Sequence, residues 1–516
     1  MKIVYTLVFF VLFSTLNQAQ FKPVFDKKKL QNQNTWLSRP TSNNEINRYS
    51  DLVLNLKKTS FTDNVNASLT DTMMHNKYGD LLNDNPFYNK KSSLEVVALR
   101  VTLSNITTFL FDRYILNYDF SRVGFNSWNN NIQKGWEWDQ DRFGMNYFFH
   151  PYSGAMFFNT ARVNGYSFFE SLPFAYLGSL EWEYFGENTR PSYNDIINTP
   201  ITGAFLGEIF YRMGSNILDD QTTGADRFFR EMAVAIMTPT RFFNRLLHGE
   251  LTRSTSAEVY QKEPLNITMA VGYHKINEGT PITLSMSSLN FNFHFDYGNP
   301  FEKRSRKPFD FFKIRTNFNF GVGRKIIENA TGNGILFGSN VQVGNFEMLT
   351  GLFQNMDYYD NNTFELGTIA FGPGVISNLK ISKSSSLNTS LHIDLMPFGA
   401  LSNRLGPDTT QVRDYDYAGG AEIKLESDYN FGWAGIALKA YYWWFHTFIG
   451  VAENSYIALI KPSITFKIYN NVSIGFEHLI HYTDRYPKDF ASIHSVRTEE
   501  KIFLQIFFEE FKFKRK

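Results

Sequence analysis

The C-terminal half of the chain alternates apolar and polar residues with a period of two. In SLNFNFHFDY, residues 288–297, every odd position is apolar and every even position is polar. KIRTNFNFGV, LNTSLHIDL, AGIALKAYYW and NVSIGFEHLI repeat the alternation less strictly, with turn signals such as Asn299-Pro300 and Asn470-Asn471 between runs. Such alternation is typical of β-strands with two different faces. About twelve segments of this kind between residues 265 and 516 predict a twelve-stranded antiparallel sheet.

The preceding region, residues 94–249, has a helical period instead. In SLEVVALRVTLSNITTFLFDRYIL the apolar residues recur at spacings of three and four, which predicts a packed or amphipathic helix. Helix-boundary signals follow at His150-Pro151, Asn164-Gly165, Thr199-Pro200 and Thr238-Pro239, because proline suits the first helical turn and glycine or asparagine the exit. We expect four to six helices, one of them starting at Pro151 with His150 near its cap.

The N-terminus predicts secretion. Residues 1–19, MKIVYTLVFFVLFSTLNQA, combine Lys2 with an apolar core too short to span a bilayer, as in a signal peptide. Residues 20–93 are polar and rich in Asn and Lys, and we expect a poorly ordered leader there. The chain has no cysteine, which excludes disulfides, thiolate metal sites and cysteine nucleophiles.

Composition separates a membrane barrel from a soluble one. Aromatic residues make up 17% of the chain, yet the mean hydropathy is only −0.29. Many short, half-apolar segments with aromatic girdles give this combination in transmembrane β-barrels. The predicted fold class is therefore mixed α and β, with a helical domain (94–249) followed by a twelve-stranded antiparallel transmembrane barrel (265–516). A soluble sandwich or barrel is the alternative.

Net charge argues against a nucleic-acid partner. The chain has 51 Lys and Arg against 50 Asp and Glu, whereas phosphate binding needs a basic excess. The expected partners are outer-membrane lipid and a small-molecule or lipid ligand, the expected location is the cell outer membrane, and the oligomeric state is left open.

The helical region resembles a known family. The succession WEWDQDRFGMNYFFHPYSGAMFFNTARVNGYSFFESLPFAYLGSLEWEYFGE, followed by PSYNDIINTPITGAFLGEIFYRMGSNILDD, resembles the bacterial domain-of-unknown-function family 3943 over about residues 80–250. The resemblance implies a protein of the Gram-negative envelope, and the family label implies no established activity.

One group of polar residues in this region suggests chemistry. His150 with carboxylates could act as a general base, and the candidate catalytic residues are His150, Asp141, Glu170 and Glu183. The competing interpretation is a hydrogen-bonded structural cluster with His150 as a cap. Ser167 and Ser179 lie in no nucleophile-elbow motif, so a serine hydrolase triad has little support.

A second group predicts a structural polar network. Glu208 and Arg212 are four residues apart on one helix face, beside the small residues Gly203 and Gly207. This spacing favours a buried ion pair next to a close helix contact. The predicted network consists of Asn146, Arg162, Asp195, Glu208 and Arg212.

A third group falls on the polar faces of the strands and is expected to line the barrel lumen: His274, His294, Asp296, His392, Asp394, Glu477 and His481. The sequence offers no metal-binding spacing and no phosphate-cradling glycine loop, so neither a metal nor a cofactor is predicted.

These features favour an outer-membrane barrel whose helical domain acts as a plug or periplasmic cap, with a role in solute or lipid passage or in envelope maintenance. One alternative is an outer-membrane hydrolase acting on lipid or envelope glycan through His150. A second is a surface interaction module with loops at residues 401–414 and 486–496.

Overall fold

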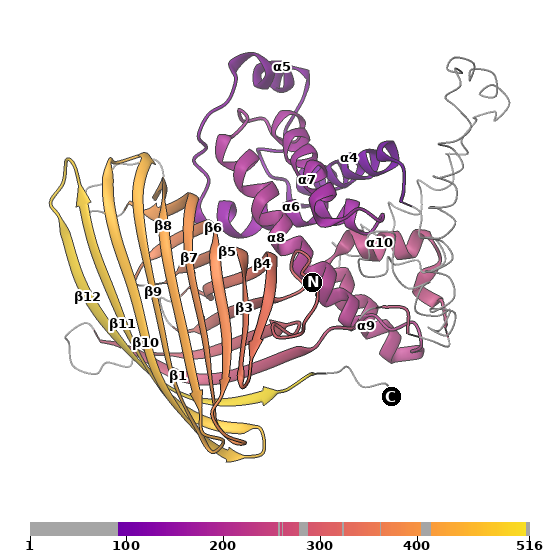
Figure 1. The fold of residues 1–516 in the computed structure, drawn as a ribbon. Coiled ribbons are helices and arrows are strands. Elements are labelled where there is room, and N and C mark those ends of the chain that lie inside the picture. Colours follow the sequence, from indigo (N-terminus) through magenta and orange to yellow (C-terminus); the bar gives the residue numbers. More distant parts are fainter. Residues whose placement is uncertain are drawn as a thin grey trace, which may run out of the picture.

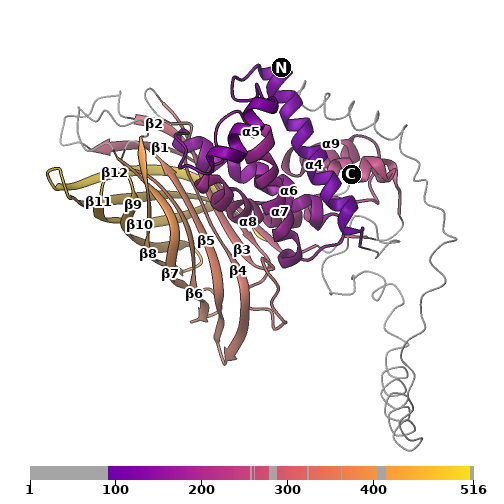
Figure 2. The ribbon, with the colours of Figure 1, turned by 90° about the horizontal axis from the view of Figure 1, so that it is seen from above.

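The computed structural model describes residues 91–255, 258–260, 262–277, 287–321, 325–361, 363–403 and 414–511. Within them a helical domain precedes a closed β-barrel in the chain, and the two lie side by side (Figures 1 and 2). The predicted signal peptide and almost all of the predicted leader lie outside the described residues.

Seven α-helices form the helical domain, interrupted by short turns of π- and 3-10-helix. The α-helices are α4 (Leu94–Phe111), α5 (Phe125–Lys134), α6 (His150–Arg162), α7 (Phe168–Glu181), α8 (Tyr193–Ile217), α9 (Gly224–Met237) and α10 (Pro239–Leu247). The turns are η1 (Asp112–Leu116), η2 (Met145–Phe149), η3 (Trp182–Gly186) and η4 (Glu250–Thr252). The described helices exceed the expected four to six because short ones, such as the nine-residue α10, carry little periodic signal.

Two predicted helix starts are wrong. His150 is not a cap, because η2 runs directly into α6 and Phe149 already has helical dihedrals. The segment 193–217 is one helix that begins seven residues before Pro200, since the Ser192 side chain accepts a hydrogen bond from the Asp195 amide at 3.3 Å and caps it. Pro200 lies inside that helix.

Glycines allow α6 and α8 to cross in backbone contact. A Cβ atom on Gly154 would lie 1.9 Å from the Thr199 carbonyl oxygen, and one on Gly203 would lie 2.4 Å from the carbonyl carbon of Gly154. The predicted close contact at Gly203 and Gly207 is confirmed, since Gly207 faces the Phe158 ring at a similarly short distance. A side chain at the crossing would push the helices apart.

The barrel is closed and antiparallel, and its predicted number of strands is confirmed. Its strands are β1 (Leu265–Asn277), β2 (Ser287–Tyr297), β3 (Phe312–Phe320), β4 (Ile327–Val343), β5 (Phe346–Asp360), β6 (Glu365–Lys380), β7 (Ser386–Ser402), β8 (Tyr415–Asn430), β9 (Ala434–Ile449), β10 (Glu453–Tyr469), β11 (Val472–Pro487) and β12 (Ile493–Phe508). Each pairs with its neighbours in sequence, and β1 pairs with β12. We call the rim where β1 begins and β12 ends the terminal rim, and the rim where β7 ends and β8 begins the opposite rim.

The two faces of the barrel wall differ in polarity. Inward positions on β9 to β12 include Lys439, Lys461, Glu477 and Lys501, which line a cavity in the lumen. Neighbouring outward positions are apolar and exposed, for example Leu438, Ile460, Ile474 and Leu504. A polar inside with an apolar outside is the arrangement of a membrane-spanning barrel.

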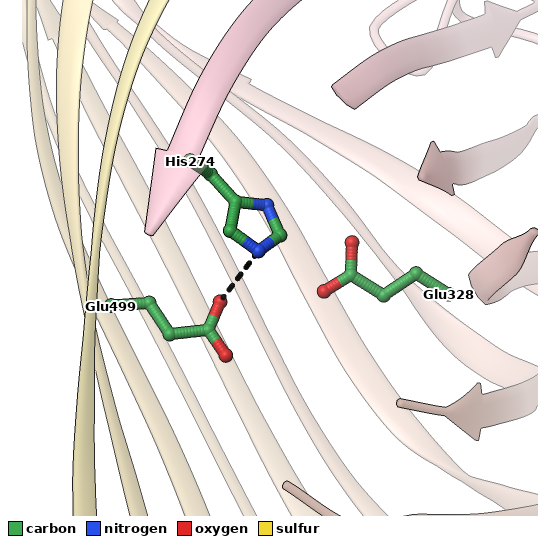
Figure 3. Close-up of side chains that lie close together, drawn as sticks. All are labelled: His274, Glu328 and Glu499. Atoms are coloured by element: carbon green, nitrogen blue, oxygen red, sulfur yellow. Dashed lines mark ion pairs between the residues drawn. The ribbon is translucent and has the colours of Figure 1, made fainter. Parts of the chain in front are cut away.

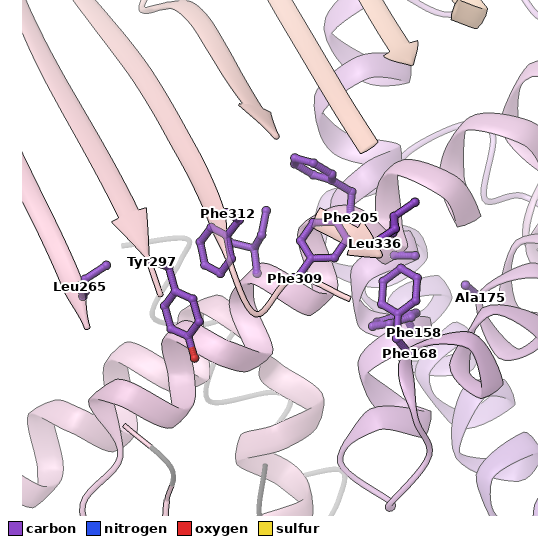
Figure 4. Packing of buried hydrophobic residues seen from close by; sticks show 11 residues of the cluster. Phe158, Phe168, Ala175, Phe205, Leu265, Tyr297, Phe309, Phe312 and Leu336 are labelled. Atoms are coloured by element: carbon purple, nitrogen blue, oxygen red, sulfur yellow. The ribbon is translucent and has the colours of Figure 1, made fainter. Parts of the chain in front are cut away.

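The helical domain packs against the outer face of this wall. Phe158, Phe205 and Ile209 form one apolar cluster with barrel residues that face away from the lumen, namely Leu265, Tyr297, Phe312 and Leu336 (Figure 4). On β1 and β2 these outward residues are at odd positions, whereas the even positions line the lumen cavity. The predicted plug or cap is therefore wrong: odd positions of these strands are apolar whether lipid or a helix covers them, so the sequence pattern could not distinguish the two.

Glycines of the covered wall leave room for the side chains that pack on it. A Cβ on Gly367 would meet the ring of Tyr147 in η2 at 2.4 Å, and one on Gly334 would meet the ring of Phe309 in the β2–β3 connection at 2.2 Å. Further along, Tyr147 stacks on Phe398, and Gln354 donates a hydrogen bond to the Ile201 carbonyl oxygen at 3.2 Å. The domain and the wall are thus shaped to each other.

Candidate functional site

Aromatic and aliphatic side chains divide the lumen into two cavities. Inward residues of strands that are not neighbours meet there: Trp443 of β9 contacts Tyr359 of β5 and Phe364, with ring centroids 5.6 and 6.2 Å apart. The Trp443 indole is fully buried and donates a hydrogen bond to Asp357 at 2.8 Å. We call this cluster the septum; its buried members are Tyr359, Phe364, Leu366, Ala370, Met396, Leu401, Ala418, Trp443, Phe445, Ile457 and Leu459.

A cavity of about 760 Å³ lies on the terminal side of the septum and reaches the turns of the terminal rim. We call it the chamber. A second cavity of about 450 Å³ lies on the opposite side, bounded by Phe364, Leu401 and Ile457 of the septum and by Arg485. Among the described residues the septum lies between the two cavities.

Cations deep in the chamber fall into two classes. Arg315 pairs with Asp296 at 2.6 Å, and Lys313 lies 3.5 Å from Glu426. Lys439, Lys461 and Lys501 also line the chamber, but no ion pair within 4 Å involves them in the part of the chain that the structure describes.

Strand register brings Lys439 and Lys461 together and places Glu477 directly opposite Lys501. Lys439 and Lys461 are direct partners across β9 and β10, so two like charges face each other. The Lys461 ammonium lies 5.2 Å from the Tyr441 ring centroid, and the Lys501 ammonium lies 6.0 Å from that of Phe503. The sequence reasoning missed these lysines, although each occupies a polar position of an alternating strand.

The residues predicted to line the lumen fall in three places. His294, Asp296 and Glu477 line the chamber. His392 and Asp394 are buried on the lumen side of the wall, next to Phe353. The rings of Phe353 and His392 meet edge-on, with centroids 4.7 Å apart. His274 and His481 are buried beside Glu499, at 3.7 and 3.3 Å respectively.

His150 lies on the other side of the barrel wall, in an acidic cluster at the opposite rim. Its Nε2 atom is 3.6 Å from Asp195 and 3.7 Å from Asp141. Asn146 connects this cluster to the barrel by donating hydrogen bonds to Asp139 at 3.1 Å and to the hydroxyl of Tyr415, the first residue of β8, at 2.6 Å. The cluster therefore fastens the start of α6 to the rim.

The charges of this cluster are strongly coupled. Burial by itself would lower the pKa of His150, but the carboxylates of Asp195 and Asp141 raise it to about 10. Burial, together with neighbouring carboxylates, raises the pKa of Glu183 and of Asp195 well above their usual range. At neutral pH the imidazole is thus a cation, which cannot serve as a general base.

Of the other proposed catalytic residues, Glu183 lies near His150 and Glu170 does not. Glu183 takes part in the electrostatics around His150 and accepts a hydrogen bond from the Ser192 amide at 2.7 Å. Glu170 is instead the capping-box residue of α7, bonded to Ser167 and to Lys91 at 2.6 Å. Glu187 influences His150 as well, and the sequence reasoning did not include it.

Glu208 lies in the middle of the helical domain, fully buried between two arginines. Arg162 donates to both carboxylate oxygens at 2.7 and 3.0 Å, and Arg212 donates at 2.8 Å. Arg212 also donates to the Pro308 carbonyl oxygen in the β2–β3 connection at 2.7 Å. Arg162, Glu208 and Arg212 form a tight ionic core, whereas Asn146 and Asp195 belong to the His150 cluster.

Comparison with known proteins adds a family match for the helical domain alone. Residues 135–240 match the model of a family described as a domain of unknown function, DUF3943, which confirms the resemblance over a shorter span than expected. The comparison with curated proteins gave no match.

Three similar solved structures each cover just under half of the chain. The NanC porin shares 8% identity, with 46% of this chain and 98% of the porin covered and a TM-score of 0.27. OmpT, an outer membrane protein of Vibrio cholerae, shares 8% identity, with 47% of this chain and 96% of OmpT covered and a TM-score of 0.24. The COG4313 outer membrane channel from Pseudomonas putida F1 shares 6% identity, with 48% of this chain and 97% of the channel covered and a TM-score of 0.26. At these scores the similarities add nothing to what the strand pairing establishes.

Proposed function

We propose that this protein is an outer-membrane barrel that holds a small anionic solute, such as a carboxylate or phosphate, in the chamber of its lumen. The observation that carries the proposal is the group of Lys439, Lys461 and Lys501, which lack ion-pair partners among the described residues. Like charges directly opposite on neighbouring strands destabilise a sheet. A bound anion would offset that repulsion.

The charge distribution of the chamber supports an anion rather than a cation. Five cationic side chains, Lys313, Arg315, Lys439, Lys461 and Lys501, line its inner part against three acids, Asp296, Glu426 and Glu477; the lining near the terminal rim adds Lys467 against Asp428, Glu509 and Glu510. Two of those acids are already paired with Arg315 and Lys313. The inner chamber therefore has a positive excess, and the septum would hold the solute there until it rearranges.

The helical domain has the polarity of a lipid-facing domain. On α9, the apolar Phe228, Phe229 and Ile236 are exposed, whereas Arg227 and Arg230 are buried. A soluble amphipathic helix has the opposite arrangement. The segment Leu94–Leu116 is also apolar and long enough to cross a membrane, and only 22% of its apolar 18-residue window is buried. We therefore propose that the apolar surface of the domain contacts membrane lipid beside the barrel.

The two alternatives have weaker support. A hydrolase using His150 as base needs a neutral imidazole, and the surrounding carboxylates favour the cation. His150 also lies outside the barrel wall, so it shares no cavity with His294 or His392. A surface interaction module needs long loops. The connection between β11 and β12 spans only residues 488–492, and most of the predicted loop at 401–414 lies outside the described residues.

Binding of a defined anion tests the proposal. Purified protein in detergent is titrated with citrate and, separately, with inorganic phosphate by isothermal calorimetry at low ionic strength. We expect saturable binding that weakens about 10-fold in a K439Q/K461Q double variant, since hydrogen bonds to charged groups contribute about 1.5–3 kcal/mol and solvent screening reduces that value.

The matched control is K488Q, because Lys488 lies on an exposed turn at the opposite rim. It should bind both anions like the unmodified protein. Absence of saturable binding, or equal affinity in the double variant, would contradict the anion chamber.

A further inference from the structure

Beyond the anion chamber, we propose that the lumen contains a binding site for one divalent transition-metal ion, formed by His274, His481, Glu328 and Glu499. The sequence predicts no metal site, because these residues are far apart along the chain and show no ligand spacing. The barrel brings them close together, and Figure 3 shows three of them, His274, Glu328 and Glu499.

Strand register explains the juxtaposition. β1, β12 and β11 are consecutive in the barrel, and His274, Glu499 and His481 all lie on their inward faces near the same height. Glu328 reaches this point from β4, next to the register shift between β3 and β4. Four strands thus supply one group each, which is a rigid framework for a coordination site.

The distances suit a shared metal better than direct hydrogen bonds. Ligand atoms of His274, Glu328 and Glu499 lie within 4.8 Å of one another, and His481 joins this group through Glu499. The Nε2 atoms of His274 and His481 are 3.7 and 3.3 Å from the Glu499 carboxylate. Ligands about 2.1 Å from a tetrahedral ion are about 3.4 Å apart. Charge-assisted hydrogen bonds are shorter, about 2.7–2.9 Å.

His481 gives an independent indication of a missing ligand. Its side chain is 3% exposed, and neither ring nitrogen has a hydrogen-bond partner among the residues that the structure describes. Its Nε2 atom points at the Glu499 carboxylate, and its ring packs against Phe364 of the septum, with centroids 5.2 Å apart. Because buried polar atoms are normally satisfied, an ion at this position would complete the coordination of His481.

The carboxylates are also oriented as metal ligands usually are. Asn290 donates a hydrogen bond to Glu328 at 3.2 Å, and Thr363 donates one to Glu499 at 3.3 Å. Such outer-shell bonds fix the ligand oxygens that face the ion. Two imidazoles with two carboxylates and no thiolate favour zinc or iron(II) over calcium or magnesium, which prefer oxygen ligands alone.

Two cations flank Glu499 on β12, namely Arg497, which is the direct partner of His481, and Lys501. Lys501 competes for the carboxylates from the chamber side. It is the direct partner of His274 across β1 and β12 and lies two residues from Glu499 on the same face. Its flexible side chain also lines the chamber. A bound ion would therefore displace the Lys501 ammonium toward the chamber, where the ammonium would pair with the proposed anion.

Zinc binding by the whole protein tests the site. Detergent-purified protein is stripped with a chelator, dialysed and titrated with Zn²⁺ by calorimetry. We expect one ion per chain, and at least about 100-fold weaker binding in H481Q and in E499Q, since loss of an outer-shell group alone costs about 10–100-fold. The control is H392Q, which removes another buried lumen histidine and should leave the affinity unchanged.

Co²⁺ absorption provides a second readout that needs no variant. Four-coordinate Co²⁺ with nitrogen and oxygen ligands should give intense visible bands on the unmodified protein, and Zn²⁺ should abolish them and raise the Tm. Either of two results would overturn the site: H481Q binding as tightly as the unmodified protein, or no visible bands and no shift in Tm with metal. Anion binding is measured separately, so failure of one proposal leaves the other to be judged on its own data.

Discussion

Glu208 shows how single residues hold the helical domain together. It is fully buried, and Arg162 and Arg212 approach it from two helices. The Arg162 guanidinium also lies 4.4 Å from the Tyr211 ring centroid. The pairing joins α6 to α8, and Arg212 extends it to the β2–β3 connection.

Replacing Glu208 with Gln should therefore destabilise the domain severely. The two arginines would lose their countercharge while remaining buried, a loss that costs about 3–5 kcal/mol. The free energy of unfolding from urea denaturation, followed by tryptophan fluorescence, measures the effect. D119N is the matched control, because the Asp119 side chain is 89% exposed in its pair with Arg122, and exposed pairs contribute about 0–1 kcal/mol. Equal stabilities of the two variants would show that Glu208 is not a structural ion.

The His150 cluster should make stability fall at alkaline pH. The pKa of His150 rises from about 6.5 when unfolded to about 10 when folded. A group whose pKa is raised on folding stabilises the fold fully when the pH is below the pKa of the unfolded state. That contribution is lost as the pH rises through the pKa of the folded state. The raised pKa of Glu183 acts in the same direction.

The corresponding measurement is the Tm of the protein between pH 6 and pH 10.5. We expect a decline across this window that is smaller in H150Q, because glutamine has no proton to lose. The expected difference in unfolding free energy between the two ends is on the order of 3 kcal/mol. A flat profile, or the same decline in H150Q, would mean that His150 is not held as a cation.

At the level of elements, strand β9 carries two adjacent tryptophans with opposite environments. Trp443 is fully buried in the septum, whereas Trp444 is 38% exposed on the outer face. The two side chains differ because successive residues of a strand point to opposite faces of the barrel wall. The septum is therefore a feature that side-chain truncation can remove without altering the outer surface of the barrel.

Replacing Trp443 with Ala should connect the two cavities of the lumen. The Trp443 indole packs against both Tyr359 and Phe364, so its removal leaves a gap in the septum. The variant is therefore expected to conduct ions in planar bilayers. W444A serves as the control and should conduct no more than the unmodified protein. A W443A variant that stays closed, or equal conductance in both variants, would place the barrier elsewhere.

The helical elements are arranged with charge inside and apolar groups outside. Arg245 on α10 pairs with Asp220 at 3.0 Å and with Glu231 at 2.9 Å, and all three are buried. The neighbouring exposed positions on α9 are phenylalanines. This polarity is the reason why we assign lipid, rather than water, to the outer surface of the domain.

At the scale of the molecule, strand alternation was enough to predict the barrel, because inward and outward positions of each strand differ in polarity. It could not predict what covers the outside. Phe205 and Leu265 are apolar in either case, and only their contact shows that a helix covers this wall. Gly332 and Gly367 are local signals of docked helical residues, since a Cβ on Gly332 would lie 3.1 Å from the Phe205 ring of α8 and one on Gly367 would lie 2.4 Å from the Tyr147 ring of η2.

The candidate sites were harder to predict for a related physical reason. The Glu208 and Arg212 spacing is local, so the pair could be predicted from one helix. His481, Glu499 and His274 meet only because β11, β12 and β1 close the barrel in a particular register. Lys439 and Lys461 likewise face each other through strand pairing alone. Sites assembled by register leave no spacing signal in the chain.

The position of the helical domain is tested most directly by cross-linking in cells. The chain lacks cysteine, so two cysteines introduced at Ile201 of α8 and Gln354 of β5 can report their contact without background. The matched pair uses Asn355, the next residue, whose side chain faces the lumen. We predict that an oxidant links position 201 to position 354 and not to position 355. Linkage to 355 and not to 354 would contradict a domain docked outside the wall and would instead place these helices in the lumen.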